Sequence, residues 1–146
     1  MTAYVVDSSV VAKWVLPESD TPLANQFAAH IRSQRESLII LDLARVETAK
    51  AIWKQFHRRL ITVAEANKLM AILTRLPVAI QQAEPLLAVG QAIALKYDRA
   101  VYDALFVALA QHLHLPGITA DEPLWMAVKA DFPQITVLRD WSGATP

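Results

Sequence analysis

Four acidic residues stand out in the sequence because of the apolar residues around them. Asp7 comes directly after the apolar run 4–6, and Asp121 lies two residues after the run 117–119. Asp103 interrupts the otherwise apolar run 102–110, and Glu47 follows Val46 in an amphipathic stretch. A lone carboxylate in apolar surroundings is costly unless another group compensates its charge. The pattern therefore predicts one site at which the acids meet.

A divalent cation is the simplest partner for such a group of acids. Carboxylates that converge without a cation repel one another and raise one another's pKa values. Ligation by Asp and Glu oxygens, without His or Cys nearby, favours hard ions such as Mg²⁺ or Mn²⁺ over Zn²⁺. An ion of this kind can contact a substrate phosphate and generate or orient hydroxide. The chemistry predicted is hydrolysis of a phosphodiester bond.

Each acid taken alone also has a purely structural interpretation. Asp7 or Ser8 would cap the helix after the first strand, and Asp121 would cap the helix that follows it. Glu47 would be a solvated helix residue, paired with a lysine one or two turns later. Asp103 would cap a helix that begins at residue 104, and Asp98 would cap the same helix a turn earlier. The functional interpretation therefore depends on the joint pattern.

The elements that position these acids alternate along the chain. Short apolar runs of strand length are separated by segments with helical periodicity, at residues 4–6, 38–41, 78–80, 117–119 and 135–138. This alternation predicts an α/β fold, with a parallel sheet of four to five strands covered by helices on both faces. Ligands of such sheets bind beyond the carboxyl ends of the strands, which is where Asp7, Glu47 and Asp121 are expected.

The helices are predicted from capping residues and apolar spacing. Thr21 and Pro22 predict the start of a helix that runs to about Ser33. Thr62 and Glu65 form a capping box. Apolar residues at spacings of three and four predict the buried face of a helix that begins near residue 43, namely Val46, Ala49, Trp53, Phe56 and Leu60. A second set predicts another such face, namely Tyr102, Leu105, Phe106, Leu109 and Leu113.

Length and composition narrow the class of protein. The chain has 146 residues, 54% of them hydrophobic, and no Gly/Ser-rich linker, so we expect one domain over residues 1–146. Its formal net charge is zero, which argues against coating nucleic acid by bulk electrostatics. The absence of cysteine excludes thiol catalysis, and three glycines are too few for a phosphate-binding loop. No apolar stretch approaches the ~18 residues of a membrane span, so we expect a cytoplasmic protein with no membrane association.

With these residues in view, the sequence resembles the PIN-domain nucleases, and among them the VapC toxins of toxin–antitoxin pairs. The resemblance extends over nearly the whole chain. It rests on four motifs, at residues 5–10, Glu47, 102–110 and 119–124. The third and fourth motifs, whose aspartates lie 18 residues apart, are the most specific.

The resemblance implies a three-layer α/β/α domain with Mg²⁺- or Mn²⁺-dependent endoribonuclease activity. Asp7, Glu47, Asp103 and Asp121 would form the catalytic cluster, and the three aspartates would hold the metal. Cleavage by water would leave 5′-phosphate and 3′-hydroxyl ends on the RNA. The resemblance also implies a homodimer and a small VapB-type antitoxin that blocks the site.

The supporting residues are less specific. Thr119 or Ser9 would supply a hydroxyl that orients water at the site. Family members often carry Ser or Thr where this chain has Ala100, and Asp98 would then take over the capping of that helix. Basic residues gather on and after the helix that contains Glu47, where they either meet RNA phosphates or form a solvated face: Arg45, Lys50, Lys54, His57, Arg58 and Arg59.

Two other functions remain open on the sequence alone. A catalytically idle PIN-like domain would work as an RNA- or protein-binding module, although such domains typically lose acids that this chain retains. The same metal chemistry could also act on DNA or on flap structures, although this chain has no insertion to grip a junction. Receiver domains and haloacid-dehalogenase-type phosphatases require a second acid beside the first strand, where this chain has Ser8 and Ser9.

Overall fold

A parallel sheet forms the centre of the protein. The computed structural model describes residues 3–17 and 21–141. Within these residues the strands pair in the order β3-β2-β1-β4-β5, and every pair is parallel. The strands are β1 (Ala3–Val6), β2 (Ser37–Leu41), β3 (Ala79–Gln81), β4 (Gly117–Thr119) and β5 (Ile135–Val137). The prediction of a parallel sheet is confirmed, and the strand bounds differ from those expected by at most one residue.

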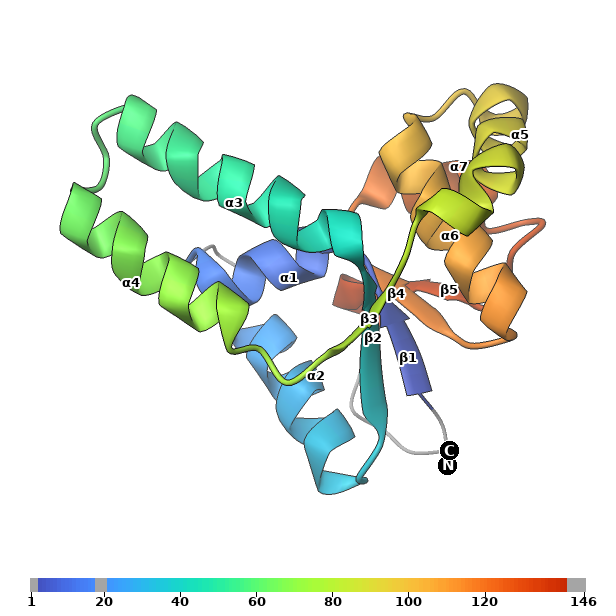
Figure 1. The fold of residues 1–146 in the computed structure, drawn as a ribbon. Coiled ribbons are helices and arrows are strands. Elements are labelled where there is room, and N and C mark those ends of the chain that lie inside the picture. Colours follow the sequence, from blue (N-terminus) through green and yellow to red (C-terminus); the bar gives the residue numbers. More distant parts are fainter. Residues whose placement is uncertain (1–2, 18–20, 142–146) are drawn as a thin grey trace.

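Helices cover both faces of this sheet (Figure 1). One face carries α1 (Ser8–Val15), α2 (Thr21–Ser33), α3 (Asp42–His57) and α4 (Val63–Thr74). The other carries α5 (Leu87–Tyr97), α6 (Val101–Leu113) and α7 (Glu122–Val128). Two 3₁₀ turns, η1 (Glu84–Leu86) and η2 (Leu138–Asp140), precede α5 and follow β5. None of the helices in the described part of the chain is long and apolar enough to cross a membrane.

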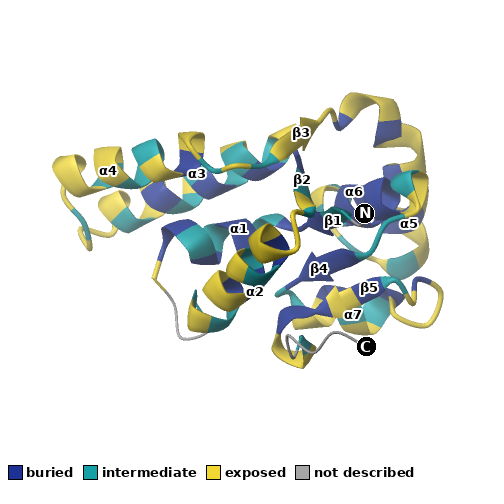
Figure 2. Cartoon of the chain, turned by 90° about the horizontal axis from the view of Figure 1, so that it is seen from below, coloured by how far each residue is buried: buried dark blue, intermediate teal, exposed yellow. Residues whose placement is uncertain are grey.

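The alternation of side chains along the strands produces two hydrophobic cores. Val5 and Leu41 pack with α5, α6 and α7, whereas Val6 and Ile40 pack with the four helices of the opposite face. Successive side chains of a strand point to opposite faces, so β1 and β2 each contribute to both cores. Figure 2 shows β4, β5 and α6 as largely buried, and β3 and the outer surfaces of α2 and α4 as exposed. The three-layer α/β/α prediction is confirmed.

Helices α3 and α4 form a hairpin that projects from the body of the protein (Figure 1). The predicted capping box starts α4: the Thr62 hydroxyl accepts from the Glu65 backbone N–H at 3.1 Å, and the Glu65 carboxylate accepts from the Thr62 N–H at 3.2 Å. The predicted start of α2 at Thr21 is also confirmed.

The predicted buried face of α3 is wrong except at Ala49, which is partly buried against the core. Val46, Trp53, Phe56 and Leu60 are exposed, and the Trp53 ring stacks on His57 with their centroids 4.9 Å apart. The buried positions of α3 are Ala44, Thr48 and Ile52, a narrow stripe at a spacing of four. Helix α3 packs against α1 and α4, and two of its three buried residues, Ala44 and Thr48, are small. Most of the larger apolar side chains of the helix lie on its outer face.

Three details of α6 also differ from expectation. Asp98 does not cap α6, because it is the C-cap of α5, with a left-handed φ of 53°. Helix α6 begins at Val101 after Ala100, which makes no side-chain capping bond. Asp103 therefore lies in the first turn of α6 instead of capping a helix that starts at residue 104. Tyr102, expected in the core, is 55% exposed, whereas Leu105, Phe106 and Leu109 are buried as predicted.

Candidate active site

Asp7 is the most buried of the acids, with 5% of its surface exposed. It follows β1 directly and is the N-cap of α1, where its Oδ1 accepts from the Ser8 backbone N–H at 2.9 Å. Its Oδ2 accepts from the hydroxyls of Ser9 and Thr119, each at 2.7 Å. The expected capping role is thus present, and two further donors hold the carboxyl group.

The two hydroxyls connect β1 to the end of β4. Ser9 Oγ accepts from the Ala120 backbone N–H at 2.9 Å, and Thr119 Oγ1 accepts from that of Asp121 at 3.0 Å. Asp121 is the N-cap of α7, because its Oδ1 accepts from the Leu124 N–H at 3.0 Å. Each hydroxyl therefore donates to Asp7 and accepts from the loop that carries Asp121, and this fixes the two aspartates relative to each other.

Glu47 and Asp103 reach the site from helices on opposite faces of the sheet. Glu47 lies in the second turn of α3, after β2, and its Oε2 accepts from the Ser8 hydroxyl at 3.3 Å. Asp103 lies in the first turn of α6. The contact of Ser8 with Glu47 was not expected from the sequence, in which Ser8 is a candidate helix cap. A hydroxyl beside an acid in the first turn of a helix is the one signal that could have indicated it.

The four acids line one cavity of about 230 Å³ together with Ser8 and Ser9. It lies at the carboxyl ends of the three adjacent strands β1, β2 and β4, the edge at which open α/β sheets bind ligands. Of the described residues, no lysine, arginine or histidine is among those that line it. The cavity is therefore acidic and lacks an internal counter-charge from the described residues.

This arrangement raises the pKa values of three acids. Burial raises the pKa of Asp7, while the hydrogen bonds from Ser9 and Thr119 oppose the rise. Burial and the charge of Asp7 raise the pKa of Glu47 to about 7. Burial and the charges of Asp7 and Asp121 raise the pKa of Asp103 to about 6. Grouped carboxylates with raised pKa values at a ligand-binding edge are a feature of functional sites.

The donor set fits a hard divalent cation. The polar side chains among the described residues that line the cavity carry carboxylate or hydroxyl oxygens, and oxygens are the ligands that Mg²⁺ and Mn²⁺ prefer. Across residues 3–17 and 21–141, no three acidic, histidine or cysteine side chains stand close enough to hold an ion by themselves. Mg²⁺ usually keeps several waters and takes one or two carboxylates directly, so water would complete the coordination. Asp7, Asp103 and Asp121 are the residues that would hold the ion, directly or through such waters.

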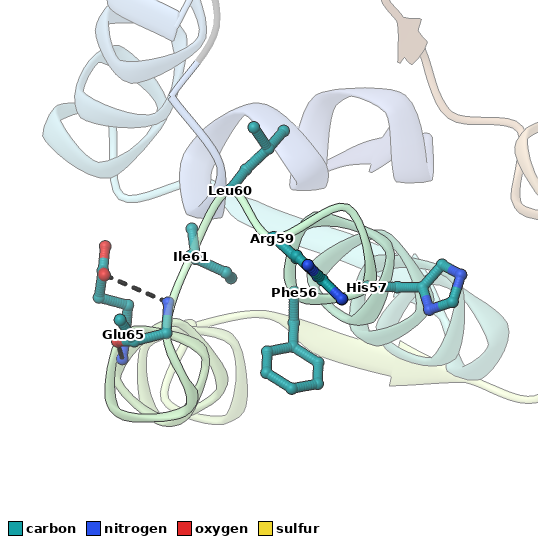
Figure 3. A pocket seen from close by; sticks show the side chains of 7 residues that line it. Phe56, His57, Arg59, Leu60, Ile61 and Glu65 are labelled. Atoms are coloured by element: carbon teal, nitrogen blue, oxygen red, sulfur yellow. Dashed lines mark hydrogen bonds between the residues drawn. The ribbon is translucent and has the colours of Figure 1, made fainter.

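A different cavity, of about 520 Å³, lies at the tip of the α3–α4 hairpin, away from the strand ends. Figure 3 shows the side chains of Phe56, Leu60 and Ile61 around it, beside the capping-box bond of Glu65. Glu65 is the acid that lines it, and its carboxylate already serves the backbone of the α4 N-terminus. This hollow therefore lacks the grouped acids that characterise the first cavity.

Comparisons with known proteins agree with this fold and its motifs. The PIN domain family model matches residues 4–125. Ribonuclease VapC3 of Pyrobaculum aerophilum is 33% identical over 122 residues, which cover 82% of this chain and 90% of that protein.

Two solved structures have the same fold. PAE2754 from Pyrobaculum aerophilum matches with a TM-score of 0.67 at 21% identity, covering 94% of this chain and 92% of that one. A toxin–antitoxin complex from Klebsiella pneumoniae matches with a TM-score of 0.63 at 18% identity, covering 93% of this chain and 98% of that one. The protein therefore belongs to the PIN-domain family, among its VapC members.

Proposed function

We propose that the protein is a Mg²⁺- or Mn²⁺-dependent endoribonuclease and the toxin of a toxin–antitoxin pair. The observation that carries this proposal is the cavity lined by Asp7, Glu47, Asp103 and Asp121 at the carboxyl ends of β1, β2 and β4. A site that carries only negative charge would repel an RNA phosphate unless a cation were bound. The relative named Ribonuclease VapC3 supports RNA as the substrate.

The residues of the acidic cavity would have different roles in the reaction. Asp7, Asp103 and Asp121 would hold the cation, which would neutralise phosphate charge and lower the pKa of water at the site. Glu47, with a pKa of about 7, is suited to take a proton from the attacking water. Ser9 and Thr119 keep Asp7 in position and favour its ionised form.

The reaction proposed is in-line attack of water on the phosphorus atom of an RNA phosphodiester. A bond forms between the water oxygen and phosphorus, and the bond from phosphorus to the 3′-oxygen breaks. The proton released by water passes to Glu47, and the 3′-oxygen leaves as a hydroxyl after protonation from solvent. The products are a 5′-phosphate and a 3′-hydroxyl end.

Cleavage of total cellular RNA by the purified chain tests this proposal. The assay is run with Mg²⁺, with Mn²⁺ and with EDTA, beside the variants Asp7→Asn and Asp103→Asn. We expect discrete fragments with either metal, and none with EDTA or in the variants. A folded wild-type protein that leaves every RNA intact under both metals would favour the alternative of an RNA- or protein-binding module.

The partner we propose is a small VapB-type antitoxin, which would block the acidic cavity. The toxin–antitoxin complex from Klebsiella pneumoniae, which has the same fold, supports this partner. We also propose that the chain forms a homodimer and acts in the cytoplasm, where its RNA substrates are found. Light scattering of the purified chain tests the dimer, and loss of cleavage on addition of the antitoxin tests inhibition.

A further inference from the structure

A second cavity, of about 340 Å³, lies against the acidic cavity and shares Glu47 with it. Its volume falls within the range of about 300–1,000 Å³ that is usual for ligand pockets. Residues from α3 and α6 line it, among them Val46, Glu47, Lys50, Lys54 and Tyr102. Tyr102 directly precedes Asp103, so α6 contributes neighbouring residues to both cavities.

The two lysines give this second cavity the opposite charge to the first. Lys50 and Lys54 follow Glu47 by three and seven residues, so all three lie on one side of α3. Both lysines are exposed, and neither forms an ion pair with a described residue. The acidic cavity repels the phosphates of RNA. Lysine side chains directly beside it would attract those phosphates and so offset the repulsion.

The cavity also offers apolar and aromatic surface. Tyr102 is 55% exposed although residues 104–110 of the same helix are buried, and Val46 on α3 is 65% exposed. Sites that bind single-stranded RNA combine aromatic side chains, on which unpaired bases stack, with cationic side chains that contact the phosphates. This cavity offers both, in Tyr102 and the two lysines. A purely apolar partner would instead cover two lysines that form no ion pair with a described residue, at a desolvation cost.

We propose that this second cavity binds one unpaired nucleotide next to the cleaved phosphodiester bond. The base stacks on the Tyr102 ring, and the adjoining phosphates contact Lys50 and Lys54. The inference rests on the proposed function, because it assigns a place to part of the RNA that the acidic cavity cleaves. The nucleotide must be unpaired, because bases inside an A-form duplex cannot reach an aromatic side chain.

Binding and cleavage are measured separately to test this assignment. Binding uses a fluorescein-labelled single-stranded RNA of 12 random nucleotides in EDTA, and cleavage uses total RNA with Mg²⁺. The test variants are Lys54→Gln and Tyr102→Leu. Their controls are Lys68→Gln, which removes an exposed lysine of α4, and Tyr102→Phe, which keeps the ring.

We expect Lys54→Gln and Tyr102→Leu to weaken RNA binding by roughly 5- to 100-fold. Both should raise KM while kcat stays within about twofold, because the acids are untouched. Lys54→Gln should also lower the slope of log K against log salt by about 0.7. Lys68→Gln and Tyr102→Phe should bind as the wild type does, and a duplex of the same length should bind equally to Tyr102→Leu and the wild type.

Three results would overturn the assignment. The first is a wild type that does not bind the oligonucleotide, and the second is Lys54→Gln and Tyr102→Leu binding as tightly as Lys68→Gln. The third is a halving of the mass of Tyr102→Leu in light scattering with unchanged RNA binding, which would make this face a contact between two copies of the chain. Binding losses in a protein that cleaves no RNA would support the nucleotide cavity and count against the proposed nuclease.

Discussion

The Thr119 hydroxyl donates to Asp7 Oδ2 at 2.7 Å, although the two residues lie 112 positions apart in the sequence. They stand at the ends of the neighbouring strands β1 and β4. Thr119 is fully buried, and its oxygen also accepts from the Asp121 backbone N–H. One hydroxyl thus favours the ionised form of Asp7 and holds the loop that carries Asp121.

Replacing Thr119 by Val should reduce cleavage by about 10- to 100-fold, the usual effect of removing a group that orients a ligand residue. Loss of one hydrogen bond to the carboxylate raises the pKa of Asp7 further, since that bond opposes the effect of burial. The acidic limb of the pH–rate profile should therefore move to higher pH. Thr119→Ser keeps the hydroxyl and should restore both activity and profile. Equal profiles for Thr119→Val and the wild type would contradict a role in positioning Asp7.

Replacing Asp103 by Asn should lower cleavage by more than about 100-fold, beyond the effect expected at an orienting residue. The free energy of unfolding should stay unchanged or increase above pH 6, because the charges of Asp7 and Asp121 no longer repel this side chain. Asp98→Asn is the matched control, since Asn tolerates the left-handed conformation of the α5 C-cap. It should cleave RNA as the wild type does. Loss of activity in both variants would show that the assay reports folding instead of chemistry.

The free energy of unfolding of the metal-free protein should fall as pH rises from about 4 to about 7. Folding raises the pKa of Glu47 to about 7 and that of Asp103 to about 6, from unfolded values near 4. The folded chain therefore binds more protons than the unfolded chain in this range, and stability is lost as pH increases. Both groups are partly exposed to solvent, which screens their charges, so each should contribute no more than about 1 kcal/mol.

Urea denaturation in EDTA at a series of pH values measures this effect. The double variant Glu47→Gln/Asp103→Asn shares every other titrating group with the wild type. The difference between the two proteins therefore isolates the two carboxyl groups. A difference that is constant from pH 4 to pH 7 would mean that the two groups titrate normally in the folded chain.

Adding Mg²⁺ or Mn²⁺ at pH 7.5 should reverse the destabilisation. A ligand that binds only the folded state stabilises it by about 2.7 kcal/mol at a 100-fold excess over its Kd. For a chain of this length, that corresponds to a rise in Tm of about 5–10 °C. Asp7→Asn should lose most of the rise, whereas Asp98→Asn should keep it. Equal rises in all three proteins would place the ion outside the acidic cavity.

The sequence predicts the positions of the acids well because strand ends and caps are local features. Asp7 and Asp121 both follow short apolar runs, and both are N-caps in the structure. The parallel sheet then brings them together, because neighbouring strands end at the same edge. The parallel topology alone predicts that the acids lie near one another. The hydrogen bonds from Ser9 and Thr119 to Asp7 could not be predicted, because they depend on the register of β1 with β4.

The outer face of α3 shows why the rest could not be predicted. A spacing of three and four identifies a stripe on a helix, but it does not say whether that stripe faces the core or solvent. In α3 the buried residues are Ala44, Thr48 and Ile52, because α1 and α4 pack closely against this side of the helix. Trp53 and Val46 are consequently exposed, and this exposure is a tertiary property that local spacing does not contain.

Arg59 provides a test of local strain at the end of α3. Its φ is 60°, and the backbone N–H groups of Arg59 and Leu60 donate to the Phe56 and Gln55 carbonyls at 2.8 and 2.9 Å. This is the Schellman pattern, in which the left-handed position is usually Gly.

Arg59→Gly should therefore stabilise the protein by about 0.5–1 kcal/mol. The left-handed conformation costs about 1–2 kcal/mol for a residue with a side chain, and the greater freedom of unfolded Gly offsets part of the gain. Arg58→Gly removes the same charge one residue earlier, where φ is −81°, and should instead destabilise the protein. Urea denaturation of both variants measures the difference. If both substitutions changed stability equally, charge at the hairpin tip and not backbone conformation would be responsible.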